Sequence, residues 1–441
     1  MANGAQCHIH HFDSSRPTPR RYPEGVSESE QRSLVATTVA LDAGSETLDD
    51  LLALLPARRR VLSWVRHGEG LVGWGTAAEI RTSGPERFAH ATKWFEELAA
   101  VSTVSDPVGV PGTGLVGFGS FAFADLPGFS VLKVPAVVVG KRGDTAWVTT
   151  VGPAATPPPP LAPTPAPEAP RDVVFADAYV DGEHWMRIVA DAVSRLQHGD
   201  LDKVVLARDL LAAASAPIDV RAVLRRLAAA YPTCWTFHVD DLFGATPELL
   251  VRRERGLVTS RVLAGTIWPT GEEDLDHALA ASLAESSKNL EEHEYAARSV
   301  ADALEPHCSS MNVPEAPFVL KLPNVMHLAT DITGVASDGV SSLDLAAALH
   351  PSAAVGGTPR EDAVALIAEI ESMERARYAG PVGWMDASGD GEWGIALRSA
   401  EMIDDRTARL FAGCGIVASS DPETELAETQ AKFVPIRDAL S

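Results

Sequence analysis

The sequence predicts an α+β protein with a large hydrophobic core. The chain has 441 residues, of which 46% are hydrophobic, and this is ample for a sizeable core. In the first part of the chain, up to about residue 151, helical and strand patterns are mixed without the strand–helix alternation that is typical of a parallel βαβ sheet. No internal repeat is visible, and the length allows two to three domains.

The first part of the chain is expected to form a β-rich subdomain over residues 31–152. Residues 1–30 are polar, carry several prolines and arginines, and indicate a flexible leader. Helices are expected at 48–55 and 88–99, and strands at 60–65, 115–123, 131–139 and 146–151. Residues 153–171 are rich in proline, which favours polyproline II and indicates a linker or a surface loop.

The second part, residues 172–441, is expected to form a larger domain of mixed helices and strands. Helices are expected at 179–198, 274–286, 288–304, 343–349, 360–371 and 422–440. Strands are expected from 203 onward, at 234–239, 258–265 and 325–335, and through residues 319, 382, 395 and 410, with a turn at 243–250.

Composition argues against several kinds of partner and location. The 60 acidic and 37 basic residues give a formal charge of -23, which disfavours attraction to nucleic acid or to an anionic membrane. No run approaches the roughly 18 apolar residues of a membrane span, and the first residues lack the features of a signal peptide. The four cysteines are widely separated, so neither a disulfide framework nor a zinc cluster is indicated. We therefore expect a cytoplasmic protein with reduced thiols.

Lys203 is the first candidate for chemistry, because it opens the apolar strand Val204-Val205-Leu206. A lysine at a pocket wall can have its pKa lowered by desolvation until it acts as a base. The structural alternative is a strand-edge lysine that extends to water. Glu248 stands at the exit of the turn at 243–250 and offers a carboxylate.

Two helices carry acidic side chains at helical spacing. Glu425, Glu428 and Lys432 are three and four residues apart and share one stripe, and Glu292 follows Asn289 by three residues. An exposed Glu428–Lys432 pair would contribute only about 0.3 kcal/mol. The functional alternative pools Glu292 and Glu428 in a Mg²⁺ site, which would also help to offset the negative charge of the chain.

A third group of residues suits a carboxylate ligand. Arg398 ends an apolar strand, and Gly413 and Gly415 lie where a ligand could approach backbone N–H groups.

Nine motifs, in this order, resemble the chorismate-utilising enzymes, which include anthranilate, aminodeoxychorismate, salicylate and isochorismate synthases. They are Asp-Lys-Val-Val-Leu-Ala-Arg, Thr-Pro-Glu-Leu-Leu, Leu-Ala-Gly-Thr, Glu-His, Leu-His-Pro, Gly-Pro-Val-Gly-Trp, Ala-Leu-Arg, Ala-Gly-Cys-Gly-Ile and Glu-Leu-Ala-Glu-Thr-Gln-Ala-Lys. The resemblance covers residues 179–440. It implies the α+β fold of anthranilate synthase component I, a large β-sheet core wrapped by helices.

The resemblance also implies roles for individual residues. Lys203 matches the base that activates water for attack at C2 of chorismate, and Glu248 matches the acid that protonates the departing C4 hydroxyl. Glu292 and Glu428 match the Mg²⁺ ligands, with Glu425 nearby. The residues that match substrate contacts are Arg398, Lys432, Gly413, Gly415, Thr266, His327, Tyr378 and Ala354.

Three positions narrow the reaction within the family. Anthranilate synthases typically have glutamine where this chain has Lys203, and many aminodeoxychorismate synthases have a nucleophilic lysine where it has Ala264. Ala354 stands where isochorismate synthases usually have alanine and salicylate synthases have threonine. Two departures from the family pattern are Asn289, in place of a frequent acidic residue near the metal, and Ala353, in place of a frequent proline.

The resemblance therefore predicts a Mg²⁺-dependent isochorismate synthase with a reversible reaction, serving menaquinone or siderophore biosynthesis. A salicylate synthase and a non-catalytic chorismate-binding protein are the alternatives. Water is the nucleophile, so no glutaminase subunit is expected, and we expect a monomer.

Overall fold

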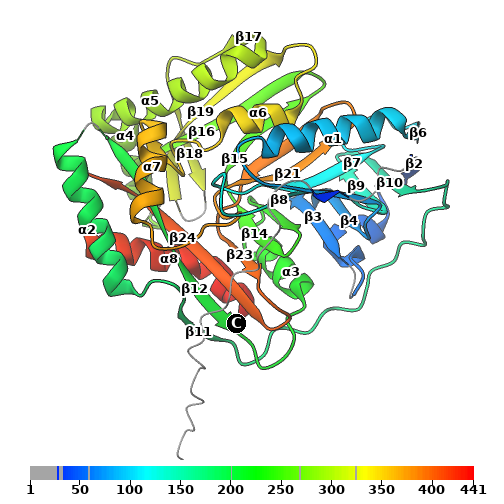
Figure 1. Ribbon diagram of the computed structural model, residues 1–441, viewed down its shortest axis with the longest axis horizontal. Coiled ribbons are helices and arrows are strands. Elements are labelled where there is room, and N and C mark those ends of the chain that lie inside the picture. Colours follow the sequence, from blue (N-terminus) through cyan, green and yellow to red (C-terminus); the bar gives the residue numbers. More distant parts are fainter. Residues whose placement is uncertain (1–26, 29–32, 58–59, 200, 268–269, 323–324) are drawn as a thin grey trace, which may run out of the picture.

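The computed structural model describes residues 27–28, 33–57, 60–199, 201–267, 270–322 and 325–441, with the backbone alone at 27–28, 264–266, 287–289, 291–292, 322 and 325. Two large β-sheets form the frame of this part of the chain (Figure 1). Apart from residues 27–28, the expected leader at 1–30 lies outside the described residues.

The first sheet has 11 strands within the described residues. They are β1 (Ser27–Glu28), β5 (Ala78–Thr82), β7 (Val116–Ser120), β8 (Ser130–Val134), β15 (Leu249–Glu254), β16 (Leu257–Ile267), β17 (Cys308–Asn312), β18 (Phe318–Leu322), β19 (Val325–Ala336), β21 (Pro381–Asp386) and β22 (Gly391–Ile395). Their order is β1-β5-β8-β7-β21-β22-β15-β16-β19-β17, and β18 also pairs with β19.

The second sheet has 13 strands within the described residues. They are β2 (Val35–Leu41), β3 (Val61–Arg66), β4 (Glu69–Trp74), β6 (Thr103–Ser105), β9 (Val137–Arg142), β10 (Thr145–Gly152), β11 (Val174–Asp177), β12 (Lys203–Ala213), β13 (Trp235–Val239), β14 (Leu242–Thr246), β20 (Gly357–Thr358), β23 (Ser399–Met402) and β24 (Thr407–Val417). Their order is β11-β12-β24-β23-β14-β13-β3-β4-β9-β10-β2-β6, with β20 on β12.

Helices cover both sheets. They are α1 (Arg87–Val101), α2 (Gly182–His198), α3 (Val220–Ala230), α4 (Glu273–Glu285), α5 (Ser287–Leu304), α6 (Ser342–Leu349), α7 (Arg360–Ile370) and α8 (Pro422–Leu440), with the short 3-10 turns η1 (Glu46–Leu48), η2 (Leu51–Leu54) and η3 (Glu305–His307). α4 and α5 lie beside β16 and β19, and α2 and α8 lie beside β24 (Figure 1). None of the described helices is long and apolar enough to cross a membrane.

Antiparallel pairing dominates, and β2 with β6 is the parallel exception among the described pairs. This pairing, with helices packed on the sheets, confirms the predicted α+β class. β7 pairs with β21, and β3 pairs with β13. The segments 31–152 and 172–441 therefore share both sheets, and the expected boundary between them divides neither sheet.

Proline explains two differences between the expected and the observed elements. The expected strand at 131–139 is two strands, β8 and β9, with Pro135 between them, and they belong to different sheets. The expected turn at 243–250 includes most of β14 and the start of β15, with Pro247 between them, and the chain again changes sheets there. Proline has no N–H for the ladder, which favours such a break.

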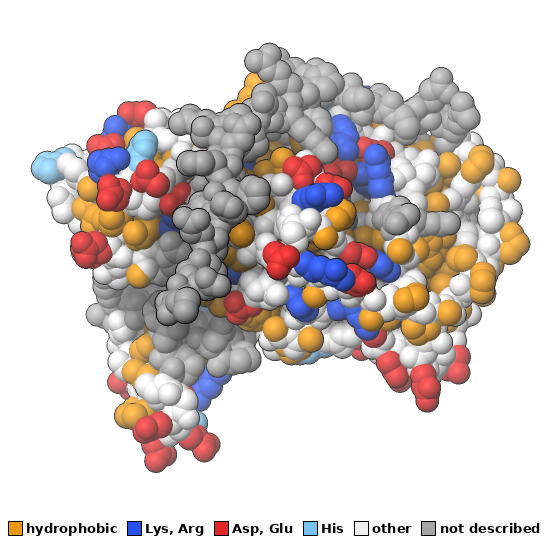
Figure 2. Space-filling model, turned by 90° about the horizontal axis from the view of Figure 1, so that it is seen from below, with side chains coloured by type: hydrophobic (Ala, Val, Ile, Leu, Met, Phe, Trp, Pro, Cys, Tyr) orange, Lys and Arg blue, Asp and Glu red, His pale blue; other side chains and the backbone are white. Residues whose placement is uncertain are grey.

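The segment at 46–54 also differs from the expected structure. The expected helix at 48–55 is instead the pair of 3-10 turns η1 and η2, and the Asp50 side chain accepts from the N–H groups of Leu52 and Ala53 at the start of η2. Thr164 in the proline-rich segment donates from Oγ1 to Ala53 O over 2.9 Å and so ties this segment to η2. On the face drawn in Figure 2, described basic and acidic side chains are interspersed.

Candidate active site

A cavity of about 420 Å³ lies beside the first strand residue of β12. Its wall is formed by β12, by β15 and β16 of the first sheet, by α5, and by the loop at 349–358. This volume is in the range that small-molecule sites occupy. The polar side chains in the wall include Lys203, Glu248, Ser260, Ser352 and Arg360, and Ala354 lines it too.

Lys203 is placed by pairing on both edges of β12. It lies opposite Val417 of β24 and opposite Thr358 of β20. Its side chain crosses the neighbouring strand over Gly415, where an added Cβ would come within 2.7 Å of the lysine Cε. The absent side chain at Gly415 therefore makes room for Lys203. Gly415 therefore has a role in placing Lys203. This role is additional to the substrate contact that the family resemblance implies for Gly415.

Glu248 lies at the point where the chain passes from β14 in the second sheet to β15 in the first. Its N–H donates to Thr246 Oγ1 over 3.2 Å, and its carbonyl accepts from Ile395 N over 3.1 Å. Burial raises the pKa of the Glu248 carboxyl to about 7, against the opposing charges of three nearby cations, Lys203, Lys432 and Arg398. A carboxyl with this pKa is partly protonated near neutral pH and can donate a proton.

Arg398 lies where the chain returns from β22 in the first sheet to β23 in the second. Its φ is 47°, in the left-handed region. Its carbonyl accepts from Ala245 N over 3.1 Å, and a Cβ at Gly244 would come within 2.5 Å of that carbonyl oxygen. The close approach requires glycine. The two sheet crossings thus bring the Arg398 guanidinium close enough to the Glu248 carboxyl to lower the pKa of that carboxyl.

The acidic stripe of α8 holds Lys432 and two carboxylates. Lys432 Nζ lies 2.6 Å from Glu428 Oε1 and donates to Gly413 O over 2.9 Å. Glu425 Oε1 accepts from Ser420 Oγ over 2.7 Å. Glu425 Oε2 is buried and has no hydrogen-bond partner among the described residues.

These carboxylates fit a hard cation. Mg²⁺ prefers oxygen ligands and needs only one or two carboxylates, because water and substrate oxygens complete its coordination. A buried carboxylate oxygen without a described partner, on Glu425 beside Glu428, suits this chemistry. The side chain of Glu292, the other expected ligand, lies outside the described side chains, as does that of Thr266. The described side chains by themselves include no group of three metal-binding residues.

Tyr378 packs against β24 at Phe411 and Gly413. The Tyr378 ring stacks on Phe411 with centroids 5.1 Å apart, and its hydroxyl lies 3.3 Å from where a Gly413 Cβ would be. Burial raises the pKa of Tyr378 above its usual value, so the phenol stays neutral. His327 lies on β19 opposite Thr266 and is half-buried. Neither Tyr378 nor His327 belongs to the described wall of the cavity.

The sequence motifs do not identify several polar residues of the cavity wall, among them Ser352 and Arg360. Ser352 Oγ is buried without a hydrogen-bond partner among the described residues. Arg360 donates from Nε to Pro351 O over 2.8 Å and from Nη2 to Ala348 O over 3.1 Å. Ser352 directly follows the Leu-His-Pro motif, and this adjacency is the signal that could have identified it.

A family model and a curated relative both place this chain in the same protein family. A sequence model described as "Chorismate binding enzyme" matches residues 161–441. The salicylate biosynthesis isochorismate synthase of Pseudomonas aeruginosa is 33% identical over 413 residues, which is 86% of this chain and 84% of that protein. The chain belongs to the chorismate-binding enzymes.

Two further relatives support this family. Isochorismate synthase MenF of Bacillus subtilis is 39% identical over 272 residues, which is 61% of this chain but only 58% of that relative's length. The structure of MenF, the menaquinone-specific isochorismate synthase from Escherichia coli, matches with a TM-score of 0.75 and 22% identity over 95% of this chain and 96% of that one. The latter likeness concerns the fold. Together these findings confirm the predicted family and fold.

Proposed function

We propose that this chorismate-binding enzyme is a Mg²⁺-dependent isochorismate synthase, which moves a hydroxyl function from C4 to C2 of chorismate. The observation that carries the proposal is a lysine and a partly protonated carboxyl, Lys203 and Glu248, in the wall of one cavity of about 420 Å³. Its relatives named as isochorismate synthases support the same reaction.

The two residues divide the proton transfers. Lys203 takes a proton from a water molecule, which attacks C2 of the ring. The ring double bond migrates, and Glu248 donates its proton to the C4 hydroxyl, which leaves as water. Each general acid or base of this kind contributes about 10² to 10⁴ in rate. One proton is accepted and one is donated in the cycle, so proton exchange with solvent restores the starting state.

The cations around Glu248 supply local positive charge, which an anionic substrate needs in order to bind to an acidic protein. The chain has a formal charge of -23, but Lys203, Lys432 and Arg398 are all close enough to Glu248 to lower its pKa. Chorismate carries two carboxylates, and a guanidinium is well suited to bind one of them in bidentate fashion. We assign Arg398 and Lys432 to carboxylate binding.

Glu428 and Glu425, with Glu292, would hold the Mg²⁺ ion. When bound, the ion supplies a positive charge that orients the substrate carboxylate and polarises the ring. No glutaminase subunit is needed, because water and not ammonia is the nucleophile. Ala354 in the cavity wall is the small residue that favours release of isochorismate over elimination of pyruvate.

Product analysis tests the proposal. Purified protein is incubated with chorismate and Mg²⁺, and the products are separated by chromatography and identified by mass spectrometry. An isomer of unchanged mass is expected, and it should disappear in Lys203→Ala. Lys93→Ala, which removes an exposed lysine of α1, is the matched control and should retain the activity. Salicylate with pyruvate would assign the chain to the lyase branch, and no turnover would favour a binding protein.

A further inference from the structure

The strand that begins with Lys203 has an incomplete outer edge. β24 pairs with β12 along its whole length, from Lys203 to Ala213. On the opposite edge, β20 pairs only with Lys203 and Val204, and β11 pairs only from Leu210 onward. Residues 205–209 therefore have no strand neighbour on that edge among the described residues. Buried backbone groups in such a gap still need hydrogen-bond partners.

Beyond Val205 N, which donates to the backbone carbonyl of Gly356 over 2.9 Å, side chains take the place of the missing strand. Ala207 N donates to Glu371 Oε2 over 2.7 Å, and Val205 O accepts from Arg375 Nη2 over 2.6 Å. Ala207 O accepts from Trp185 Nε1 over 3.2 Å. Arg375 thus completes the edge at Val205, two residues beyond Lys203, and Glu371 completes it at Ala207, four residues beyond.

The same two side chains form a buried ion pair. Arg375 Nε lies 2.6 Å from Glu371 Oε1, and Nη2 lies 2.7 Å from Oε2, with each side chain 3% exposed. The Arg375 guanidinium carbon lies 4.2 Å from the centroid of the Phe123 ring. A bidentate pair with this packing has one preferred geometry. The pair is therefore a rigid support for whatever else it contacts.

Arg375 also reaches the loop that carries Ala354. Its Nη1 donates to Val355 O over 2.9 Å, while Nη2 donates to Val205 O. One guanidinium thus bridges Val205 of β12 and Val355, the neighbour of Ala354, in addition to the direct pairing of β20 with Lys203 and Val204. Neither Arg375 nor Glu371 belongs to the described wall of the cavity.

We infer that Glu371 and Arg375 are a positioning pair, which holds the strand of Lys203 and the loop of Ala354 at the separation that the reaction requires. This inference rests on the proposed function. A displacement of about 1 Å between a catalytic group and its substrate can cost roughly a hundredfold in rate. The substrate carboxylates are assigned to Arg398 and Lys432 on other elements, so the pair should affect kcat more than KM.

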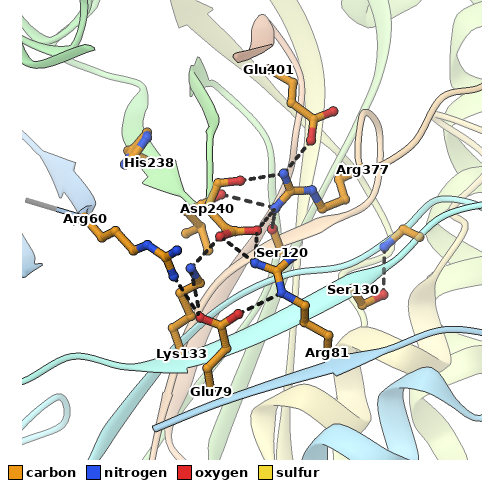
Figure 3. Close-up of polar contacts among 12 residues, drawn as sticks. Arg60, Glu79, Arg81, Ser120, Ser130, Lys133, His238, Asp240, Arg377 and Glu401 are labelled. Carbon is orange, nitrogen blue, oxygen red and sulfur yellow. Dashed lines mark hydrogen bonds and ion pairs between the residues drawn. The ribbon is translucent and has the colours of Figure 1, made fainter. Parts of the chain in front are cut away.

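Arg375→Lys tests the inference, with Arg377→Lys as its matched control. Arg377 is two residues away, is 1% exposed, and lies 2.5 Å from Glu401 Oε1 and 2.8 Å from Ser120 Oγ. Figure 3 shows it directed into a separate polar cluster with Asp240. Its side chain donates hydrogen bonds to Ser120, Val239, Asp240 and Glu401, none of which lies on β12 or in the loop at 349–358. Both variants exchange a buried guanidinium for an ammonium.

We expect Arg375→Lys to lower kcat by about ten- to a hundredfold, with KM changed less than about threefold, because an ammonium cannot make the forked contacts. Arg377→Lys should lower thermal stability and leave kcat within about threefold. In hydrogen exchange, peptides covering 203–209 and 352–358 should exchange faster in Arg375→Lys and not in Arg377→Lys. Equal losses of kcat in the two variants, or unchanged exchange in Arg375→Lys, would overturn the inference.

Glu371→Gln keeps the inference testable if Arg375→Lys does not fold. The amide oxygen can still accept from Ala207 N, but the charge that fixes Arg375 is gone. A smaller loss of kcat with faster exchange at 203–209 is expected, and wild-type values for both would refute the pair's role. If the wild-type protein makes no isochorismate, the proposed function fails, and the exchange comparison alone decides whether the pair positions these segments.

Discussion

Replacing Glu248 with glutamine should stabilise the protein at alkaline pH while it removes activity. The pKa of this carboxyl is about 7 in the folded protein, against an ordinary value of 4.5. The folded state therefore holds the proton more tightly than the unfolded state. Its contribution to stability is fully present below pH 4.5 and is lost as the pH rises to about 7. Glutamine resembles the protonated acid and does not ionise, so the variant avoids this loss.

The rise in the Glu248 pKa on folding sets the size of the expected gain in stability. A difference of two to three pKa units corresponds to about 3 kcal/mol at most above pH 7. At the usual unfolding entropy per residue, a chain of 441 residues should then melt about 3 °C higher. We would compare wild type and Glu248→Gln by calorimetry in EDTA at pH 5 and pH 8.5. The variant should gain at pH 8.5 and much less at pH 5.

Activity gives the second half of this test. Because the reaction needs Glu248 protonated and Lys203 unprotonated at the same time, the wild-type kcat should pass through a maximum with pH, and Glu248→Gln should lose the fall on the alkaline side. Glu248→Gln should lower kcat by about 10² to 10⁴. A melting difference that does not depend on pH, or an alkaline fall in kcat that persists in Glu248→Gln, would refute the assignment of Glu248 as a buried general acid.

Three other substitutions test individual contacts. Gly415→Ala should lower kcat by about tenfold or more, because the added methyl would lie 2.7 Å from Lys203 Cε; steady-state kinetics measures this, and an unchanged kcat argues against the placement of the lysine. Glu428→Gln should weaken Mg²⁺ binding by at least about tenfold in calorimetric titration, whereas the exposed Glu423→Gln should not; equal affinities would remove Glu428 from the metal site. Ser352→Ala should raise KM for chorismate by about fivefold if its buried hydroxyl meets the substrate, and an unchanged KM would exclude that contact.

Local sequence patterns predicted much of the frame of the site. The sequence predicts the last helix at 422–440, and α8 spans these residues because Asp421 caps it and Pro422 suits its first turn. The strand that begins at Lys203 was expected from its β-branched residues and is β12. Where a motif includes both the functional residue and its local structure, the sequence is enough to place the residue on its element.

Contacts between distant segments could not be predicted in this way. Periodicity does not say that Pro247 separates strands of two different sheets, or that Arg398 marks the return crossing. Glu371 and Arg375 are four residues apart, so they look like an ordinary helical pair, but α7 ends at Ile370 and their partners are on β12. Such partners follow from tertiary packing, which a local pattern does not encode.

In the proposed reaction the site adds a solvent water molecule to chorismate, with Lys203 as the base. The most direct measurement is turnover in water enriched with heavy oxygen, followed by mass spectrometry of the isochorismate formed. We expect a product heavier by one labelled oxygen, located at C2, and we expect no such product from Lys203→Ala. Isochorismate that carries no label would show that the hydroxyl is transferred within the substrate and would contradict the role assigned to Lys203.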